Sequence, residues 1–239
     1  MVGAQMRRLW VMLTLCGSLM AGVASAATQP VSRFLEPADL DPALVLPPPP
    51  ADGSDAARAE LAELHTIQEA RTPERLSQAR HDDELEDVRA IADVLPNFDI
   101  ARLPATAKLF ADLRNEDSVA AKRAKAYFSR TRPWAIDGSL TPCDKGDAVK
   151  TSYPSGHATM GYAAAGLLAQ LVPDRAQLVL ARAADYAESR LVCGVHYRRD
   201  VNAGAVLGTV LVLKLMEKPA FRAEFDTARA ELRAAKIAP

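Results

Sequence analysis

The chain has 239 residues, which suits one domain, and its 49% hydrophobic and 25% charged residues are ordinary for a globular protein that buries a core. The formal net charge is −1, so the composition offers no basic surface for a nucleic-acid polymer and excludes that class of partner.

The first 26 residues have the pattern of a secretory signal peptide. A basic pair, Arg7 and Arg8, precedes an apolar stretch over residues 9–23, and small residues at 24–26 form a cleavage site. The apolar stretch is short for a membrane span, so an uncleaved anchor is the weaker interpretation. We therefore predict cleavage after Ala26, a periplasmic or secreted protein, and no stable membrane association after cleavage.

The mature chain would keep two cysteines, Cys143 and Cys193. In an oxidising compartment an isolated pair favours a single disulfide, with two buried thiols as the alternative. Closing a loop of this length would stabilise the fold by roughly 3–4 kcal/mol.

Residues 27–54 are rich in Pro, Ala and Asp and contain four consecutive prolines at 47–50. Such a segment cannot form an interior helix and is expected to be an extended N-terminal arm. Several apolar side chains favour docking of the arm on the domain rather than free solvation: Leu40, Leu44, Val45 and Leu46.

From residue 55 to residue 239 the pattern is helical. Composition and apolar spacing predict helices over 56–69, 82–95, 104–113, 117–129, 155–171, 175–189, 200–215 and 219–235. No alternating strand pattern is present. The apolar run at 203–213 is too short to span a membrane and is followed by Lys214, so it predicts a buried core helix. The sequence thus predicts an all-α, single-domain helical bundle.

Three clusters carry candidate chemistry. In the first, Lys125 and Arg132 are seven residues apart, two helical turns, and Pro133 disfavours helical geometry at Arg132. The pattern places two cations near the end of one helix. Alone it is weak evidence, because most Lys/Arg pairs are solvated.

The second cluster is the sequence Pro154-Ser155-Gly156-His157 at the start of a predicted helix. The first backbone N–H groups of a helix lack internal partners and, with the helix dipole, bind oxyanions. Ser155 adds a hydroxyl donor, Gly156 permits close approach to the backbone, and His157 lies beside the anion. A capping serine with an incidental histidine is the alternative.

The third cluster is Arg190, His196 and Asp200, with Ser189 before the arginine. A carboxylate four residues after His196 can fix the imidazole tautomer and leave the other nitrogen free as a nucleophile. Arg190 offers a planar fork for phosphate oxygens. A surface His–Asp pair is the alternative if this cluster stands alone. The other mature histidines, at 65 and 81, lie in polar helical segments and are predicted to be at the surface.

In order and spacing, the three clusters resemble the signature of the type 2 phosphatidic acid phosphatase superfamily, which includes vanadium haloperoxidases: Lys125-x6-Arg132-Pro133, Pro154-Ser155-Gly156-His157 and Ser189-Arg190-x5-His196-x3-Asp200. The chain looks most like the secreted bacterial class A non-specific acid phosphatases over nearly all of its mature length. The likeness is weakest over about 72–98. The sequence Tyr197-Arg198-Arg199 also departs from the family and leaves substrate preference open.

This resemblance implies a helical-bundle acid phosphatase that hydrolyses small phosphomonoesters of broad range. His196 would attack phosphorus, Asp200 would orient it, and His157 would protonate the leaving alcohol. The phosphate ligands would be Lys125, Arg132, Ser155, the Gly156 amide and Arg190. No metal and no cofactor is expected. Phosphotransfer to other alcohols and assembly into a homo-oligomer stay open.

Three other functions are compatible with parts of this pattern. A vanadate-dependent haloperoxidase uses a similar anion site, but such enzymes are usually much longer. A phosphatase acting in solution on lipid phosphates is the second. A non-catalytic phosphate-binding protein is the third, and the histidine pair 157 and 196 argues against it because binding needs neither. Trp134 is predicted to be a core residue, with stacking on aromatic substrates as the alternative.

Overall fold

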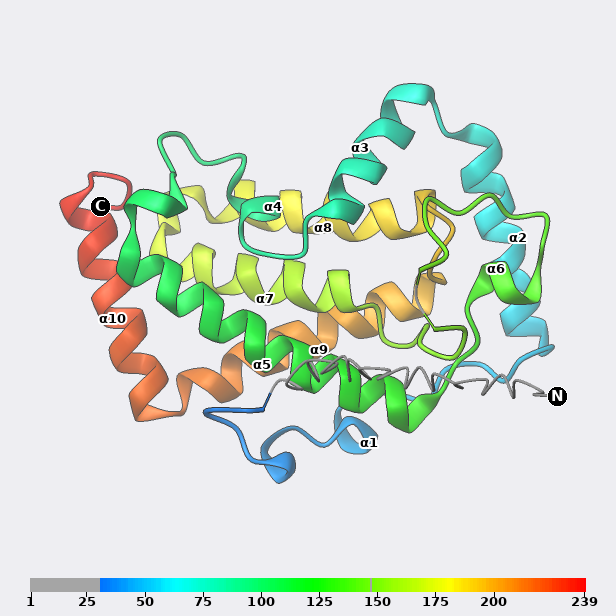
Figure 1. Cartoon of the computed structure of the whole chain (residues 1–239), viewed down its shortest axis with the longest axis horizontal. Helices are drawn as coiled ribbons and strands as arrows, with labels where there is room; N and C mark the ends of the chain where they lie inside the picture. Colours follow the sequence, from blue (N-terminus) through cyan, green and yellow to red (C-terminus); the bar gives the residue numbers. More distant parts are fainter. Residues whose placement is uncertain (1–30, 147) are drawn as a thin grey trace, which may run out of the picture.

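A computed structural model describes residues 31–146 and 148–239, so the predicted signal peptide at 1–26 and the first residues of the arm lie outside the described residues. Throughout that described part, every regular element is a helix, and the all-α prediction is confirmed (Figure 1). In chain order the elements are η1 (Pro37–Leu40), α1 (Pro42–Val45), α2 (Asp55–Ala70), α3 (Pro73–Glu84), α4 (Arg89–Ala92), η2 (Ile100–Arg102), α5 (Pro104–Phe128), α6 (Pro133–Ile136), α7 (Gly156–Leu171), η3 (Pro173–Arg175), α8 (Ala176–Val192), α9 (Arg198–Met216) and α10 (Pro219–Ala234).

The bundle is built around α7, which packs against α5, α8 and α9, while α10 crosses one end and contacts α5 (Figure 1). The contact between α7 and α9 is very close because α9 carries glycine there. A Cβ built on Gly204 would lie 2.6 Å from the Ser155 carbonyl oxygen, and one on Gly208 would lie 2.2 Å from that of Thr159. No larger residue fits at these two positions without separating the helices.

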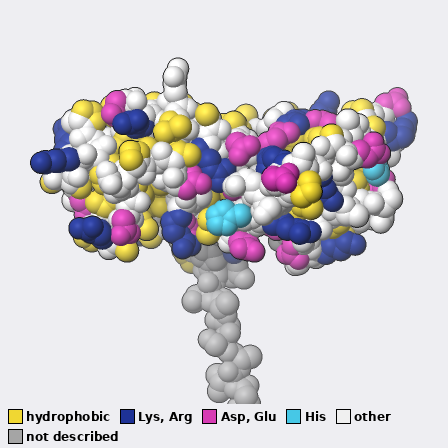
Figure 2. Space-filling view, turned by 90° about the horizontal axis from the view of Figure 1, so that it is seen from above, with side chains coloured by type: hydrophobic (Ala, Val, Ile, Leu, Met, Phe, Trp, Pro, Cys, Tyr) yellow, Lys and Arg dark blue, Asp and Glu magenta, His cyan; other side chains and the backbone are white. Residues whose placement is uncertain are grey.

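None of the helices that the structure describes combines the length and the hydropathy needed to cross a bilayer, and this includes the predicted core helix α9. On the face drawn in Figure 2, acidic and basic side chains are interspersed rather than gathered into areas of one sign.

The region between α2 and α5 differs from the prediction. The expected helix over 82–95 is wrong: α3 ends at Glu84, the next residues are irregular, and α4 has a single turn. Apolar residues in this stretch, such as Val88 and Ile91, are buried in the core, but they do not belong to one continuous helix. The sequence analysis also missed α3, although Thr72 caps it by accepting a bond from the Arg75 amide and Pro73 opens it.

The two predicted helices at 104–113 and 117–129 are one 25-residue helix, α5. The polar residues between them suggested a break, but Glu116 and Asp117 are buried. Glu116 accepts hydrogen bonds from the Ser32 hydroxyl at 2.7 Å and the Phe34 amide at 3.1 Å. These buried carboxylates face neighbouring segments, so the polar sequence does not mark a helix end.

The described part of the arm docks on α5 and contains two short turns, η1 and α1, so the expectation of a wholly extended segment is wrong. Leu40 and Leu46 are buried, whereas Leu44 is 86% exposed. The arm also accepts a hydrogen bond at the Pro47 carbonyl from the Tyr153 hydroxyl, at 2.6 Å. The docking therefore combines apolar burial with backbone hydrogen bonding.

The predicted disulfide between Cys143 and Cys193 is present. It links the loop after α6 to the end of α8, and the Cys143 amide donates to the Cys193 carbonyl at 3.0 Å. Cys193 belongs to a small buried cluster with Ala79 of α3 and Val195. The bridge thus fixes the loop beside the segment that carries Arg190 and His196.

Candidate active site

The three sequence clusters meet where four helix ends converge: the exit of α5, the first turn of α7, the last turn of α8 and the entry to α9. Helix α5 ends at Phe128, four residues earlier than Arg132, because Ser129 adopts a left-handed conformation with φ of 48°. Arg132 is therefore the cap residue of α6 in extended geometry. This places its guanidinium deep in the protein, against His196.

The ring of His196 is 1% exposed and makes one contact through each nitrogen. Nε2 lies 2.8 Å from Nη1 of Arg132, which also donates to the Val195 carbonyl at 2.8 Å. Because arginine only donates, Nε2 must hold its lone pair toward the guanidinium, and the ring proton is on Nδ1. Nδ1 lies 3.4 Å from Oδ2 of Asp200. This tautomer leaves Nε2 available as a nucleophile.

The Asp200 carboxylate is fully buried in a network that the sequence analysis missed. Its Oδ1 accepts from Nη1 of Arg130 at 2.6 Å, and its Oδ2 accepts from the Ser152 hydroxyl at 2.6 Å and the Tyr197 amide at 2.9 Å. The Arg130 guanidinium also binds Glu60 of α2 at 2.7 Å and lies over the Tyr197 ring. Only the Tyr197 amide is a local partner, three residues before Asp200; no local pattern identifies Arg130, Ser152 or Glu60, because each comes from a different part of the chain.

Burial and charge shift the pKa values of this pair in opposite directions. Burial, then the neighbouring cations Arg132 and Lys125, hold the pKa of His196 well below its ordinary value. Burial raises the pKa of Asp200, and the attraction of Arg130 opposes that rise. His196 is therefore neutral in mildly acidic solution, as a nucleophile must be.

The first turn of α7 is the candidate anion-binding part of the site. Ser155 caps the helix, its hydroxyl accepting from the Ala158 amide at 3.3 Å. A Cβ on Gly156 would lie 3.9 Å from Nζ of Lys125 and 3.2 Å from Oε1 of Glu86. The lysine ammonium thus lies beside the free amides of the helix start, where an oxyanion binds most favourably.

His157 lies between α7 and the end of α3. Its Nε2 lies 3.1 Å from the main-chain carbonyl of Asp83 and its ring stacks on Tyr186, with centroids 5.8 Å apart. Nδ1 lies 3.7 Å from Oε1 of Glu86. Burial, then Arg190, lowers the pKa of His157 well below its ordinary value. The negative charge of a bound phosphate would oppose the repulsion from Arg190 and favour the protonated ring.

Arg190, at the last turn of α8, is buried and its Nη1 contacts Oδ1 of Asp83. Trp134 is half-buried: it packs against the buried cluster around Cys193, as predicted for a core residue, and it also lines a cavity at this site. A cavity of about 120 Å³ is lined by Asp83, Arg132, Trp134, Asp144, His157, Arg190 and Val195. A second cavity, of about 310 Å³, reaches Lys125 and Gly156 from the side of α5.

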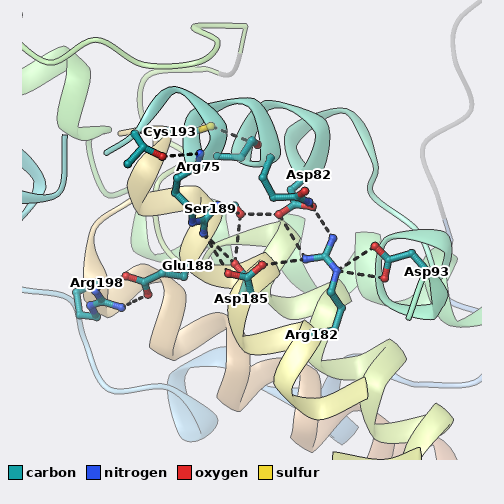
Figure 3. A network of polar contacts seen from close by, with 12 residues as sticks. Arg75, Asp82, Asp93, Arg182, Asp185, Glu188, Ser189, Cys193 and Arg198 are labelled. Atoms are coloured by element: carbon teal, nitrogen blue, oxygen red, sulfur yellow. Dashed lines mark hydrogen bonds and ion pairs between the residues drawn. The ribbon is translucent and has the colours of Figure 1, made fainter. Parts of the chain in front are cut away.

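Two arginines follow His196 in the sequence and raised the question of added positive charge at the site. Arg198 instead pairs with Glu188 of α8 (Figure 3). It also pairs with Glu63 of α2 at 2.8 Å. The Arg199 amide donates to Glu60 at 2.8 Å. Arg198 therefore helps join α2, α8 and α9 and is neutralised by two carboxylates.

Comparisons with known proteins agree on one family. Residues 111–222 match the PAP2 superfamily. The chain is 31% identical to an acid phosphatase of Zymomonas mobilis subsp. mobilis over 92% of this chain and 89% of that protein. It is 30% identical to a non-specific acid phosphatase of Providencia stuartii (80% and 81% covered) and 32% identical to one of Salmonella typhimurium (78% of each).

The fold has a solved counterpart. A crystal structure described as the first bacterial vanadium-dependent iodoperoxidase aligns with a TM-score of 0.51 at 20% identity, covering 72% of this chain and 52% of that one. The chain thus spans about half the length of that protein, and the likeness concerns the fold. Sequence identity over most of both chains places the molecule more narrowly: it belongs to the PAP2 superfamily and, within it, to the non-specific acid phosphatases.

Proposed function

We propose that this chain is a periplasmic or secreted acid phosphatase with a broad substrate range. It would hydrolyse small phosphomonoesters through a phosphohistidine at His196. The observation that carries the proposal is the orientation of the buried His196 ring, with Nδ1 toward Asp200 and Nε2 toward Arg132. A non-catalytic phosphate-binding protein would need no buried, oriented nucleophile of this kind.

The first chemical step follows from that orientation. Nε2 of His196 forms a bond to phosphorus as the bond to the leaving oxygen breaks, and His157 gives its proton to that oxygen. The attacking ring becomes cationic, and the Asp200 carboxylate balances this charge while Nδ1 keeps its proton. Charge on the three equatorial phosphoryl oxygens is stabilised by Lys125, Arg132, Ser155, the Gly156 amide and Arg190.

The second step releases the product. Water attacks phosphorus, His157 takes the water proton, and the bond from phosphorus to Nε2 of His196 breaks. Inorganic phosphate then leaves and both imidazoles return to their starting states. Another alcohol could replace water in the same position, which would give phosphotransfer.

A turnover and trapping experiment tests the proposal. The purified mature chain is assayed with p-nitrophenyl phosphate at pH 5.5 in EDTA, then quenched in base, where phosphohistidine survives, and analysed by peptide mass spectrometry. We expect turnover and a phosphoryl group on the peptide containing His196, with neither in the His196→Ala variant. Turnover without a phosphoryl group there, or activity abolished by EDTA, would refute the mechanism. Halide oxidation in added vanadate would instead identify a haloperoxidase.

A further inference from the structure

The end of α3 is anchored on α8 one residue before the phosphate-site arginine. Asp82 of α3 is fully buried and accepts from the Ser189 hydroxyl and from Nη2 of Arg182, both at 2.5 Å (Figure 3). Arg75 of α3 donates in turn to Ser189 at 2.9 Å. Ser189, although part of the family signature, thus serves in this chain as the attachment point of α3 and not as a phosphate ligand.

This anchor determines where the next side chain lies. With Asp82 fixed at Ser189, the carboxylate of Asp83 reaches Arg190, and its Oδ1 contacts Nη1 of the guanidinium. The side chains are 17% and 3% exposed respectively, so the pair is largely shielded from water. Within the part of the chain that the structure describes, the buried Nε of Arg190 has no hydrogen-bond partner. One edge of the guanidinium is therefore taken by a carboxylate while another donor stays unsatisfied.

A phosphoryl oxygen and a carboxylate oxygen bind arginine in the same way, through short charge-assisted hydrogen bonds. Both cannot occupy the same N–H group, and two anions that share one cation repel each other. We propose that Asp83 competes with phosphate for Arg190, so that it lowers the affinity of the site for phosphoryl groups and weakens retention of the inorganic phosphate product. This inference rests on the proposed function, in which Arg190 is a phosphate ligand.

The expected size follows from population arithmetic. If the contact between Asp83 and Arg190 is closed about 90% of the time, the apparent affinity for phosphate is reduced roughly tenfold. The reduction applies to the substrate phosphoryl group as well as to the product, because both need the same arginine. Loss of the carboxylate should therefore lower KM and the inhibition constant of inorganic phosphate together, without raising kcat.

The variant Asp83→Asn isolates this effect, because it removes the charge and keeps the size of the side chain. It also keeps the main-chain carbonyl of Asp83, which contacts His157. The neighbouring exposed residue offers a matched control, Glu84→Gln, which removes one negative charge from the same turn of α3.

The measurement is calorimetric binding of inorganic phosphate at pH 5.5, with thermal unfolding in the presence and absence of phosphate. We expect Asp83→Asn to bind phosphate about tenfold more tightly than the wild type, while Glu84→Gln stays within about twofold. Without phosphate, Asp83→Asn should also melt at a lower temperature, since Arg190 loses its partner, and phosphate should raise its Tm more than that of the wild type.

Unchanged or weaker phosphate binding by Asp83→Asn would overturn the inference and leave the carboxylate a purely structural role. Should that variant fail to fold, Asp83→Ala tests the same expectation. Binding needs no turnover, so the two proposals can fail separately. Tighter phosphate binding by the variant of a protein that hydrolyses no phosphomonoester would refute the proposed function and not the competition.

Discussion

The two histidines of the site lie in very different surroundings. His196 sits in a fully buried network in which Asp200, Arg130 and Glu60 fix one another through hydrogen bonds of 2.6–2.7 Å. His157 faces the end of α3, where its contacts are a main-chain carbonyl at 3.1 Å and a carboxylate at 3.7 Å.

This difference corresponds to the chemistry proposed for each ring. A nucleophile must hold one tautomer and one direction, which a rigid, buried network provides. A group that gives and then takes a proton must change its charge in each cycle, which is easier beside weaker contacts and partly accessible carboxylates. The buried network around His196 should therefore control the attack on phosphorus. The end of α3, beside His157, should control proton transfer and phosphate affinity.

Removal of either imidazole gives the largest expected effects and tests this division directly. His196→Ala should lose roughly 10⁴-fold or more in kcat on every substrate. His157→Ala should lose less on p-nitrophenyl phosphate than on an alkyl phosphate, because an aryl oxide leaves without a proton. Steady-state kinetics on the two substrates provide the measurement, and equal losses by His157→Ala on both would contradict its role.

Loss of the disulfide should be the next largest effect. Cys143 and Cys193 are 50 residues apart, and opening a loop of that size costs about 4 kcal/mol in the chain-entropy model. The double variant Cys143→Ser/Cys193→Ser should lose about that much free energy of unfolding in urea titrations. Added reductant should have no further effect on the double variant, and unchanged stability would show that packing alone holds this loop.

A substitution of Arg130 tests the buried network around His196. Arg130 opposes the rise in the pKa of Asp200, so Arg130→Lys should let Asp200 protonate at higher pH. We expect kcat/KM to fall roughly 10- to 100-fold, and more at pH 5 than at pH 7.5. Glu63→Gln, which touches only the half-buried Arg198, is the matched control, and a uniform loss at every pH would indicate a structural role alone.

The pH dependence of the wild type follows from the two lowered imidazole pKa values. In the free enzyme His196 must be neutral and His157 must be protonated, and burial lowers the pKa of both rings. A lower pKa of His196 extends activity toward acidic pH. A lower pKa of His157 makes the activity decline at a lower pH on the alkaline side. We therefore expect the optimum of kcat/KM below pH 7. A rate that still rises above pH 8 would contradict the assignment.

The last prediction concerns stability beside the site and not turnover. Burial raises the pKa of Asp117 to about 8, although Arg114 lies 3.1 Å away and opposes the rise. An unfolded aspartate has a pKa of about 4. The folded state then binds the extra proton, so the free energy of unfolding should decrease as pH rises from about 4 to about 8. Asp117→Asn should flatten this dependence and be more stable than the wild type at pH 8, measured by urea unfolding. Asp226→Asn, at an exposed position, should change nothing.

The sequence predicted well those features that depend on neighbouring residues. The helices α2, α7 and α10 follow apolar spacing and clear start signals, and the signature residues do come together. What it missed is polar and long-range. Asp82, Arg130 and Glu60 are typical surface residues in a one-dimensional pattern, and only the folded chain shows that each is buried against a partner far away in sequence. Helix α3 was not predicted for the same reason, because it contacts α8 through buried polar groups such as Asp82.

The glycine contact between α7 and α9 has a consequence for how this enzyme can change. His157 stands on one of these helices and His196 lies two residues before the other, so the distance between the two imidazoles depends on how closely the two helix backbones approach. A single methyl group at position 204 or 208 would widen that distance without replacing any side chain of the site. Substitutions that change substrate range can therefore occur in the loops and in α3, whereas no other residue can replace either glycine.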